Sequence, residues 1–329
     1  LDVSKIVNLQ YFTIQQNEDA CVKVTQNQLD DIPDEGSNSG WYINNTSTGG
    51  QYLSVTGCWT IIADENDVGY PIDFYKKNNR MFIADYIDIN LGFGRVIEKT
   101  NGNWNIILDN SAGQSNNIYD VERPTSVFEA PNGDLYVVSS SNHKVIRKPS
   151  GQSTWEIVVD DSGNESAIEY VRDPHNVFVT ENNDIYISIG GGSSSAKVIK
   201  KSSDDNNWSI VADNSGDTND INYIANPWNI FVSENNDIYI IDKSFQKVIK
   251  KSSVDSSWSI IADNTNNTSD NYVRSPGGIF VTESGDIYIG DEGIPKVIKK
   301  SSNDSSWSLI AETNTSNYGG NLNYIEGVK

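Results

Sequence analysis

The chain has 329 residues, of which 45 are acidic and 24 are basic, so its net charge at pH 7 is −21. A charge of this sign repels nucleic-acid phosphates and anionic membrane surfaces, which excludes nucleic acid as a partner. No stretch approaches the ~20 apolar residues that a membrane-spanning helix needs, so we expect no membrane insertion.

The first 64 residues predict short strands without a regular pattern. The runs rich in β-branched and aromatic residues are Lys5–Ile14, Cys21–Thr25, Trp41–Ile43 and Gln51–Val55, followed by the phrase CWTIIAD around Trp59. We predict that Cys21 and Cys58 form a disulfide, as expected in a secreted chain with only two cysteines; two free buried thiols are the alternative. If they belong to the inner and outer strands of one sheet, about 14 Å would separate them, too far for a disulfide.

From residue 59 onward the chain repeats. The phrase Trp-x-Ile-Ile-Ala-Asp recurs with its tryptophan at positions Trp59, Trp104, Trp155, Trp208, Trp258 and Trp307. Three more phrases precede each later copy, as in SPGGIFVT, GDIYIG and KVIKK, so each unit holds four strand-like runs. Ile and Val stand at consecutive positions, which predicts sheets buried on both faces. Four strands per unit of this length are typical of a β-propeller.

The regular units cover residues 70–109, 124–160, 174–213, 227–263 and 276–312. We predict a single all-β domain over residues 1–329, a six-bladed propeller of four-stranded antiparallel blades. Residues 1–64 supply a divergent first blade, 65–312 the five regular blades and 313–329 a closing segment. The phrases resemble those of NHL-repeat propellers, a family whose members bind protein, RNA or sugar or catalyse reactions, so the resemblance implies the fold and not the function.

The N-terminal region offers one strand more than its blade requires. Either the segment from Val3 to Ile14 closes the ring beside the C-terminal segment, or a neighbouring molecule receives it as an added strand. The second arrangement would build a homo-oligomer or a filament.

The residues that differ between units gather where inner strands begin, at the expected mouth of a central channel. Equivalent ring positions hold Asp73, Ser126, Asn176, Asn229 and Gly278, and the positions beside them hold Ile72, Thr125, His175, Trp228 and Gly277. We predict ligand binding by Asp73, Ser126, His175, Asn176, Trp228 and Asn229. The set Asp73, Asn176 and Asn229 also resembles the oxygen-ligand calcium site of gluconolactonase-like propellers, which implies Ca²⁺ as a possible cofactor. A water-filled, hydrogen-bonded channel is the structural alternative.

Other polar positions repeat with the blade. Asp85, Asp242 and Asp291 end second strands and face Arg95, Lys247 and Lys296, so we expect them to cap turn amides or to pair with these bases. No catalytic residue is assigned, because the chain has only two histidines and no nucleophile motif.

Eight Asn-x-Ser/Thr sequons indicate an extracellular glycoprotein, and the start of the chain at Leu1, without a charged leader, favours a processed secreted product. Asn164, Asn267 and Asn314 follow outer strands and are the preferred positions; the others are Asn44, Asn45, Asn207, Asn266 and Asn303. The function these features favour is a non-catalytic module that needs no cofactor and binds a protein or a carbohydrate, or builds an extracellular assembly. The alternative is a metal-dependent hydrolase or lactonase with His175 as a proton carrier.

Overall fold

The computed structural model describes residues 68–77, 80–88, 93–100, 102–110, 118–190, 195–294, 296–304 and 306–312, together with five short strands near the two chain ends. Over these residues the chain forms strands and turns. None of the described segments is a helix long and apolar enough to cross a membrane.

Five four-stranded antiparallel sheets form the blades, each built from consecutive strands. Blade 1 contains β5 (Tyr70–Lys77), β6 (Arg80–Asp88), β7 (Phe93–Thr100) and β8 (Asn103–Asp109). Blade 2 contains β9 (Pro124–Glu129), β10 (Leu135–Ser139), β11 (Lys144–Lys148) and β12 (Glu156–Asp160). Blade 3 contains β13 (Pro174–Val179), β14 (Ile185–Ile189), β15 (Lys197–Lys201) and β16 (Trp208–Asp213). Blade 4 contains β17 (Pro227–Val232), β18 (Ile238–Asp242), β19 (Lys247–Lys251) and β20 (Trp258–Ala262). Blade 5 contains β21 (Pro276–Val281), β22 (Ile287–Asp291), β23 (Lys296–Lys300) and β24 (Trp307–Glu312).

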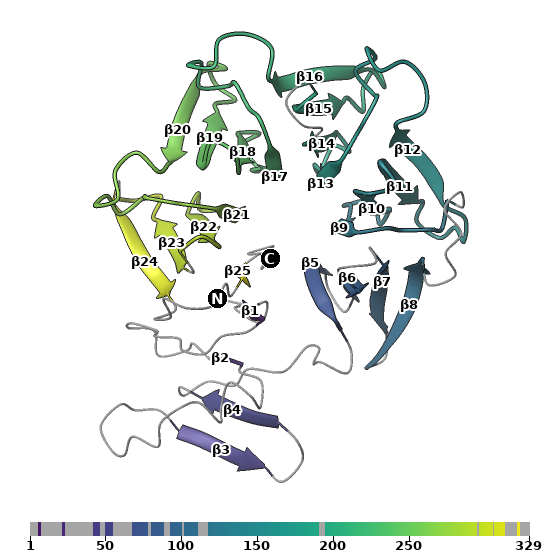
Figure 1. The fold of residues 1–329 in the computed structure, drawn as a ribbon, viewed down its shortest axis with the longest axis horizontal. Coiled ribbons are helices and arrows are strands. Elements are labelled where there is room, and N and C mark those ends of the chain that lie inside the picture. The colour runs from purple at the N-terminus through teal and green to yellow at the C-terminus, as the bar shows by residue number, and fades with distance from the viewer. Residues whose placement is uncertain are drawn as a thin grey trace.

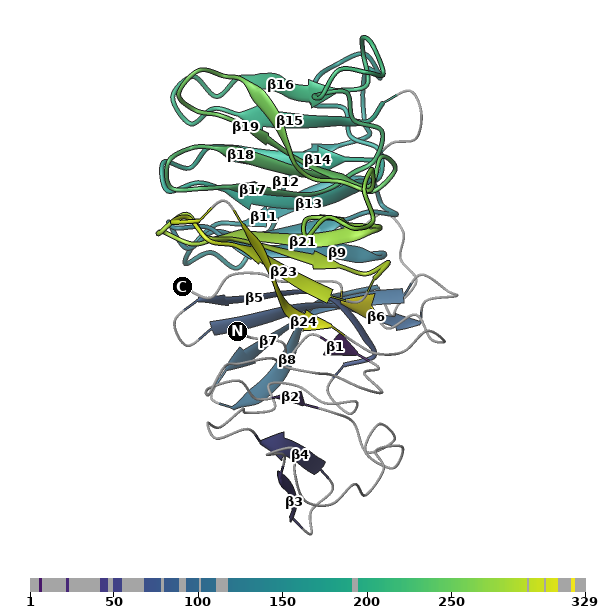
Figure 2. The ribbon, with the colours of Figure 1, turned by 90° about the vertical axis from the view of Figure 1, so that its left-hand side faces the viewer.

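The blades follow one another around a common centre, with the first strand of each nearest the centre and the fourth at the rim (Figure 1). The inner strands contact in sequence, β5 with β9, β9 with β13, β13 with β17, and β17 with β21. Figure 2 shows the blades from the side, with their strands running across the thickness of the molecule. We call the face at which the inner strands begin the mouth face, and the other the opposite face.

The hydrophobic core lies between neighbouring blades. One cluster joins Val138 and Val145 of blade 2 to Val177 and Ile187 of blade 3, and equivalent clusters join blades 1 and 2, 3 and 4, and 4 and 5. All five residues of β10 and of β14 are buried, because each of these second strands has a sheet on both sides. Burial on both faces explains why Ile and Val occupy consecutive positions.

Aromatic residues also connect the inner strands. Tyr75, Phe128, Phe178, Phe231 and Phe280 stand at equivalent positions, and successive ring centroids are 4.8, 5.1, 5.1 and 5.6 Å apart. Contacts at these separations add edge or tilted ring interactions to the burial of area. This aromatic row therefore ties all five blades together near the propeller axis.

The prediction of six blades is wrong: the described chain forms five. The N-terminal region contributes β2 (Val22–Lys23), β3 (Tyr42–Thr46) and β4 (Gly50–Ser54), which form a three-stranded sheet in the order β2-β4-β3. Within the described residues, the predicted strand Lys5–Ile14 contributes β1 (Ile6–Val7). The region lacks the second and third repeat phrases, so nothing in it fixes the register of a long four-stranded sheet.

β1 pairs antiparallel with β25 (Asn321–Leu322), with Ile6 opposite Leu322. These strands lie between blade 5 and blade 1 (Figure 1). The pairing is the intramolecular one of the two arrangements that the surplus strand allows. Cys21, Cys58 and the Trp59 phrase lie outside the described residues, so their disulfide stays a prediction.

Candidate functional site

A β-bulge begins every inner strand on the mouth face. In each blade the register against the second strand shifts just after the first proline, which leaves one residue unpaired in the bulge. Proline donates no ladder hydrogen bond, and a bulge re-aims the side chain of its extra residue. The bulge residues are Ile72, Thr125, His175, Trp228 and Gly277, which are the positions that the sequence comparison found to vary beside the ring.

A second variable position lies next to each bulge, directly after the second-strand residue that pairs with the proline. It is occupied by Tyr86, Ser140, Gly190, Lys243 and Glu292 in blades 1 to 5. In blades 3, 4 and 5 the backbone amide at this position donates to a carbonyl of the link before the inner strand, at 2.9, 3.1 and 2.9 Å. The two variable positions of one blade are therefore held close together.

The two positions complement each other in size. A Cβ on Gly190 would come within 2.3 Å of His175 Cε1, and a Cβ on Gly277 would come within 2.3 Å of Glu292 Oε1. Each glycine therefore makes room for the large side chain beside it. In blade 4 both positions are large and stack, with Lys243 Nζ 3.8 Å from the centroid of the Trp228 ring.

Six side chains form one connected group across four blades, which we call the mouth cluster. Five of them occupy the two variable positions, and the sixth, Asp173, lies in the link before β13. The members are Ser140, Asp173, His175, Trp228, Lys243 and Glu292. The His175 and Trp228 rings lie 4.4 Å apart, and Lys243 Nζ is 2.9 and 3.0 Å from the two carboxylate oxygens of Glu292. At the other end, His175 Nε2 lies 3.5 Å from Asp173 Oδ2, and the Ser140 hydroxyl donates to Asp173. The cluster runs from blade 2 to blade 5.

The charges at the two ends of the cluster have different surroundings. Lys243 and Glu292 are 17% and 15% exposed. Burial lowers the pKa of Lys243 and raises the pKa of Glu292, each opposed by the charge of the other residue. Asp173 is half exposed, and the hydrogen bond from His175, supported by Ser140 and by the charge of Arg123, lowers its pKa to about 2 from 3.8.

The lowered pKa of Asp173 predicts a pH-dependent contribution to stability. Because the folded pKa lies below the unfolded one, the contribution is present above pH 3.8 and is lost as the pH falls toward about 2. We expect Asp173→Asn to lose less stability than the native chain over this range. Asn also tolerates the φ of +58° found at this position. Thermal unfolding followed from pH 5 to pH 2 measures the difference, and parallel curves for the two proteins would contradict it.

The predicted ring positions connect neighbouring blades. Asp73 accepts from the amide of Phe74 at 2.7 Å and from the amide of Val127, in blade 2, at 2.8 Å. Asn176 donates to the Ser126 hydroxyl at 3.2 Å and accepts from the amide of Ile230, in blade 4, at 3.4 Å. These side chains are almost fully buried and act as ties between blades.

Asn229 is the exception among them. It is 2% exposed, and its amide nitrogen has no hydrogen-bond partner among the described residues. The equivalent position of blade 5 is Gly278, which offers no side chain as a partner. The structure thus joins Ser126 to Asn176 and His175 to Trp228.

Within the described ranges, no group of three or more His, Cys, Asp and Glu side chains is arranged to hold a metal ion. The side-chain oxygens of Asp73 and of Asn176 accept hydrogen bonds from backbone amides, and these bonds connect neighbouring blades. Calcium binding at Asp73, Asn176 and Asn229 stays a prediction.

The repeated aspartates cap turn amides as expected. Asp242 accepts four backbone amides, at 2.8 to 3.2 Å, and Asp291 accepts those of Arg274, Ser275, Gly293 and Ile294. Asp85 accepts the amide of Gly69 and pairs with Arg95 at 2.8 Å. Lys247 instead donates to the carbonyls of Ile221 and Tyr223, so pairing with the base is shown for Asp85 alone of the three.

The sequence reasoning missed Asp173, Lys243 and Glu292. A sequence signal for Lys243 and Glu292 was present, because the residue directly after the proline's partner in the second strand varies between blades as much as the bulge residue does. What the sequence could not show is that the two variable positions meet, since this depends on the bulge register and on contacts between blades.

The sheets, the inter-blade core and the variable mouth face define a β-propeller. No protein-family model and no curated protein matches the chain. Among solved structures, a chain of a nidogen/laminin complex is similar, with a TM-score of 0.54, 9% identity, and coverage of 73% of this chain and 80% of that one. A virginiamycin B lyase from Staphylococcus aureus is similar with a TM-score of 0.50, 11% identity, and coverage of 76% and 72%. At these identities the likeness shows the propeller fold; the NHL resemblance stays a prediction.

Proposed function

We propose that the chain is a non-catalytic binding module that holds a protein partner on its mouth face. The observation that carries the proposal is the mouth cluster, in which the residues that break the blade repeat form one connected group. Packing alone explains residues that repeat with the blade, but it does not require a different side chain in each blade at two adjoining positions. Binding of one asymmetric partner does require such differences.

The surroundings of the cluster have the composition of a contact surface. Tyr119 and Phe245 are 42% and 38% exposed, and both lie in mouth-face loops. Arg123, Arg172 and Arg274, half of the six arginines of the chain, are exposed in the links that precede inner strands. Aromatic residues and arginine contribute most of the binding energy in protein interfaces, which favours a protein partner.

The likeness to a nidogen/laminin complex supports a propeller that binds protein, and the likeness to a lyase supports the alternative, a metal-dependent hydrolase or lactonase. The engagement of Asp73 and Asn176 in blade-to-blade hydrogen bonds favours the binding module, which needs no cofactor. Elemental analysis of the purified protein separates the two. A tightly held divalent ion that is lost in Asp73→Asn would support the enzyme.

A secreted glycoprotein is part of the proposal. Asn164, Asn207, Asn266, Asn267 and Asn303 are exposed, as glycan attachment requires; Asn44 and Asn45 lie in β3, and Asn314 lies outside the described residues. Asn164 and Asn267 lie in the links between an outer strand and the next inner strand, closer in sequence to the outer strand. Glycans there would leave the centre of the mouth face open to a projecting loop or chain end of the partner.

We therefore expect protein from a secreting eukaryotic host to lose mass on glycosidase treatment, because several exposed sequons would carry glycans. Intact-mass measurement before and after treatment checks this. Replacing Asn164 and Asn267 together by glutamine should remove part of the difference. An unchanged mass would remove the support for the glycoprotein.

The binding proposal is tested by photo-crosslinking from the mouth face. A photoreactive residue is placed at position 245, and in a matched protein at position 254, where Val254 is 93% exposed on the opposite face. Both proteins are incubated with extracellular fluid of the organism that produces the protein and are then irradiated. One partner crosslinked from position 245 and absent from position 254 supports the proposal. The same products from both positions, or none from position 245, would contradict it.

A further inference from the structure

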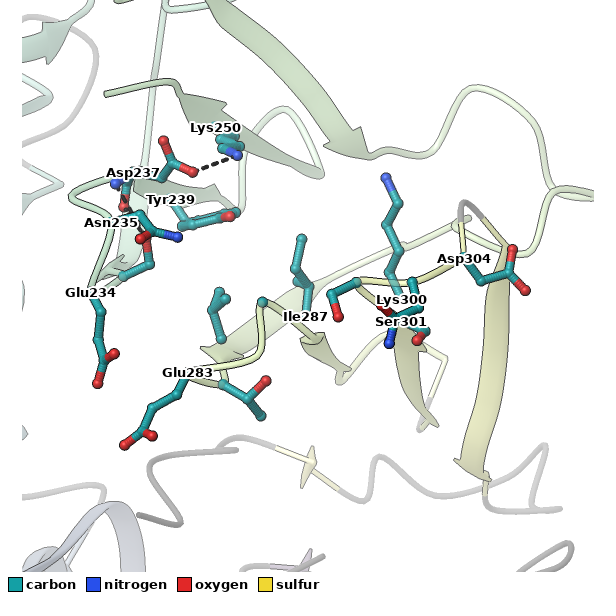
Figure 3. A pocket seen from close by; sticks show the side chains of 16 residues that line it. Glu234, Asn235, Asp237, Tyr239, Lys250, Glu283, Ile287, Lys300, Ser301 and Asp304 are labelled. Atoms are coloured by element: carbon teal, nitrogen blue, oxygen red, sulfur yellow. Dashed lines mark hydrogen bonds and ion pairs between the residues drawn. The ribbon is translucent and has the colours of Figure 1, made fainter. Parts of the chain in front are cut away.

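The opposite face holds a pocket that the mouth-face proposal does not use. It has a volume of ≈ 470 Å³ and lies between blades 4 and 5, at the turns that follow their inner strands and at the turn that follows the third strand of blade 5 (Figure 3). This volume falls in the range of small-molecule sites. Blade 4 contributes Glu234, Asn235 and Lys250, and blade 5 contributes Glu283, Lys300 and Ser301.

The pocket has an apolar floor and a polar wall. Val281, Ile287 and Tyr239 line it and are buried, at 6, 7 and 3% exposure. Around them stand hydroxyl, amide and carboxylate groups from the turns of both blades. A ligand with many hydroxyl groups can exchange hydrogen bonds with such a wall, while its less polar ring face covers the floor.

The charged side chains are distributed unevenly around the pocket. Of the two lysines in the lining, Lys250 is paired with Asp237 at 2.6 Å, and Lys300 lies over the Trp307 ring with its Nζ 6.0 Å from the centroid. Glu234 and Glu283 come from equivalent turns of neighbouring blades, extend the same way in Figure 3, and form no ion pair within the described part of the chain. One side of the pocket therefore presents two carboxylates that a cation can engage.

The neighbouring grooves between described blades lack part of this combination. The position of Glu234 is taken by Pro131 in blade 2, so of the two glutamates only the equivalent of Glu283, Glu181, is present between blades 2 and 3. Between blades 3 and 4 the exposed Val254 stands where blade 5 has Asn303. The two carboxylates and the polar edge occur together only between blades 4 and 5, among these three grooves.

We propose that this pocket binds an amine-bearing sugar, such as an oligosaccharide of glucosamine, with its amine groups toward Glu234 and Glu283 and its hydroxyl groups toward the serine and amide wall. The net charge of −21 attracts a cationic ligand to the surface. The site is separate from the mouth face, so its occupation does not depend on the protein partner.

The test is a calorimetric titration of the full chain at mildly acidic pH and low salt. The protein is treated with glycosidase first, because Asn303 at the pocket edge is one of the predicted glycosylation positions. The three probes are the glucosamine trimer, the N-acetylglucosamine trimer and trilysine. The first carries both sugar hydroxyl groups and amine charges, the second carries the sugar without the charges, and the third carries the charges without the sugar. We expect the glucosamine trimer to bind about tenfold more tightly than either of the other two, since only it satisfies both parts of the site.

Three variants locate the binding. Glu234→Gln and Glu283→Gln should each lower the affinity for the glucosamine trimer by about threefold to fivefold, which is the effect of losing one exposed ion pair. The matched control is Glu181→Gln, which removes the same charge from the equivalent turn of blade 3 and should change the affinity by less than about twofold. All three positions are exposed, so folding is expected to be unaffected. Absence of binding, equally tight binding of trilysine, or an equal loss in Glu181→Gln would overturn the proposal.

Discussion

We expect Asp242→Ala to lower the free energy of unfolding by about 3 to 5 kcal/mol, because the substitution removes a fully buried carboxylate that accepts four backbone amides. Its oxygens accept the amides of Ala225, Asn226, Ser244 and Phe245 at 2.8, 3.2, 2.9 and 3.2 Å. These amides belong to the link before β17 and to the turn after β18, so their loss loosens both parts of blade 4 that hold the mouth cluster. Chemical denaturation measures the change.

The matched control for this substitution is Asp263→Ala. Asp263 also accepts within a turn, from the amide and the hydroxyl of Thr265 at 3.0 and 2.7 Å, but this turn faces solvent. Water can replace these bonds, so the expected loss is below about 1 kcal/mol. Equal losses in the two variants would show that burial of the Asp242 carboxylate contributes nothing.

We expect Lys243→Met to cost about 3 kcal/mol, because it leaves the carboxylate of Glu292 buried without its partner. Methionine keeps the contact with the Trp228 ring, so the loss of stability measures the effect of removing the lysine charge. The double variant Lys243→Met/Glu292→Gln should recover most of this stability, since it leaves no buried charge. A double-mutant cycle by chemical denaturation gives the coupling; additive losses would contradict the pairing.

The pH dependence of Lys243→Met provides a second readout. The pKa of Glu292 is already raised by burial, and removing the lysine charge raises it further. A carboxyl group with a raised folded pKa favours folding at low pH and loses that contribution as the pH rises through the folded value. The destabilisation of Lys243→Met relative to the native chain should therefore shrink as the solution is made acidic. A deficit that stays constant with pH would argue against a buried charge on Glu292.

The regular blades could be predicted because each strand carries its own signal. Consecutive Ile and Val residues require burial on both faces, and the Asp and Asn residues between them mark turns, so β9 to β24 follow the phrases closely. Of these phrases the first 67 residues carry only the copy around Trp59, and counting strand-like runs there gave a sixth blade that the described residues do not form. Lys5–Ile14 had the composition of an inner strand, but composition does not reveal its partner, and β1 pairs with β25 instead.

The candidate site could be predicted in part. Comparing equivalent positions identified His175 and Trp228 because they vary, and they do contact each other. The resemblance to gluconolactonase-like propellers implied Asp73 and Asn176 as metal ligands. In the structure they accept amides from the next blade, and the calcium site stays a prediction. Sequence shows which residues differ but not which atoms they face. Lys243 and Glu292 are 49 residues apart, and only the blade-to-blade geometry brings them into contact.

In the proposed function, the protein partner contacts the mouth face. The most direct measurement is the affinity of the crosslinked partner for the native chain, for Phe245→Ser and for Val254→Ser. Both substitutions remove an exposed apolar side chain, but from opposite faces. We predict that Phe245→Ser weakens binding by about tenfold or more, as for an aromatic residue at an interface, and that Val254→Ser leaves it within about twofold. Unchanged affinity in Phe245→Ser, or an equal loss in Val254→Ser, would contradict the account.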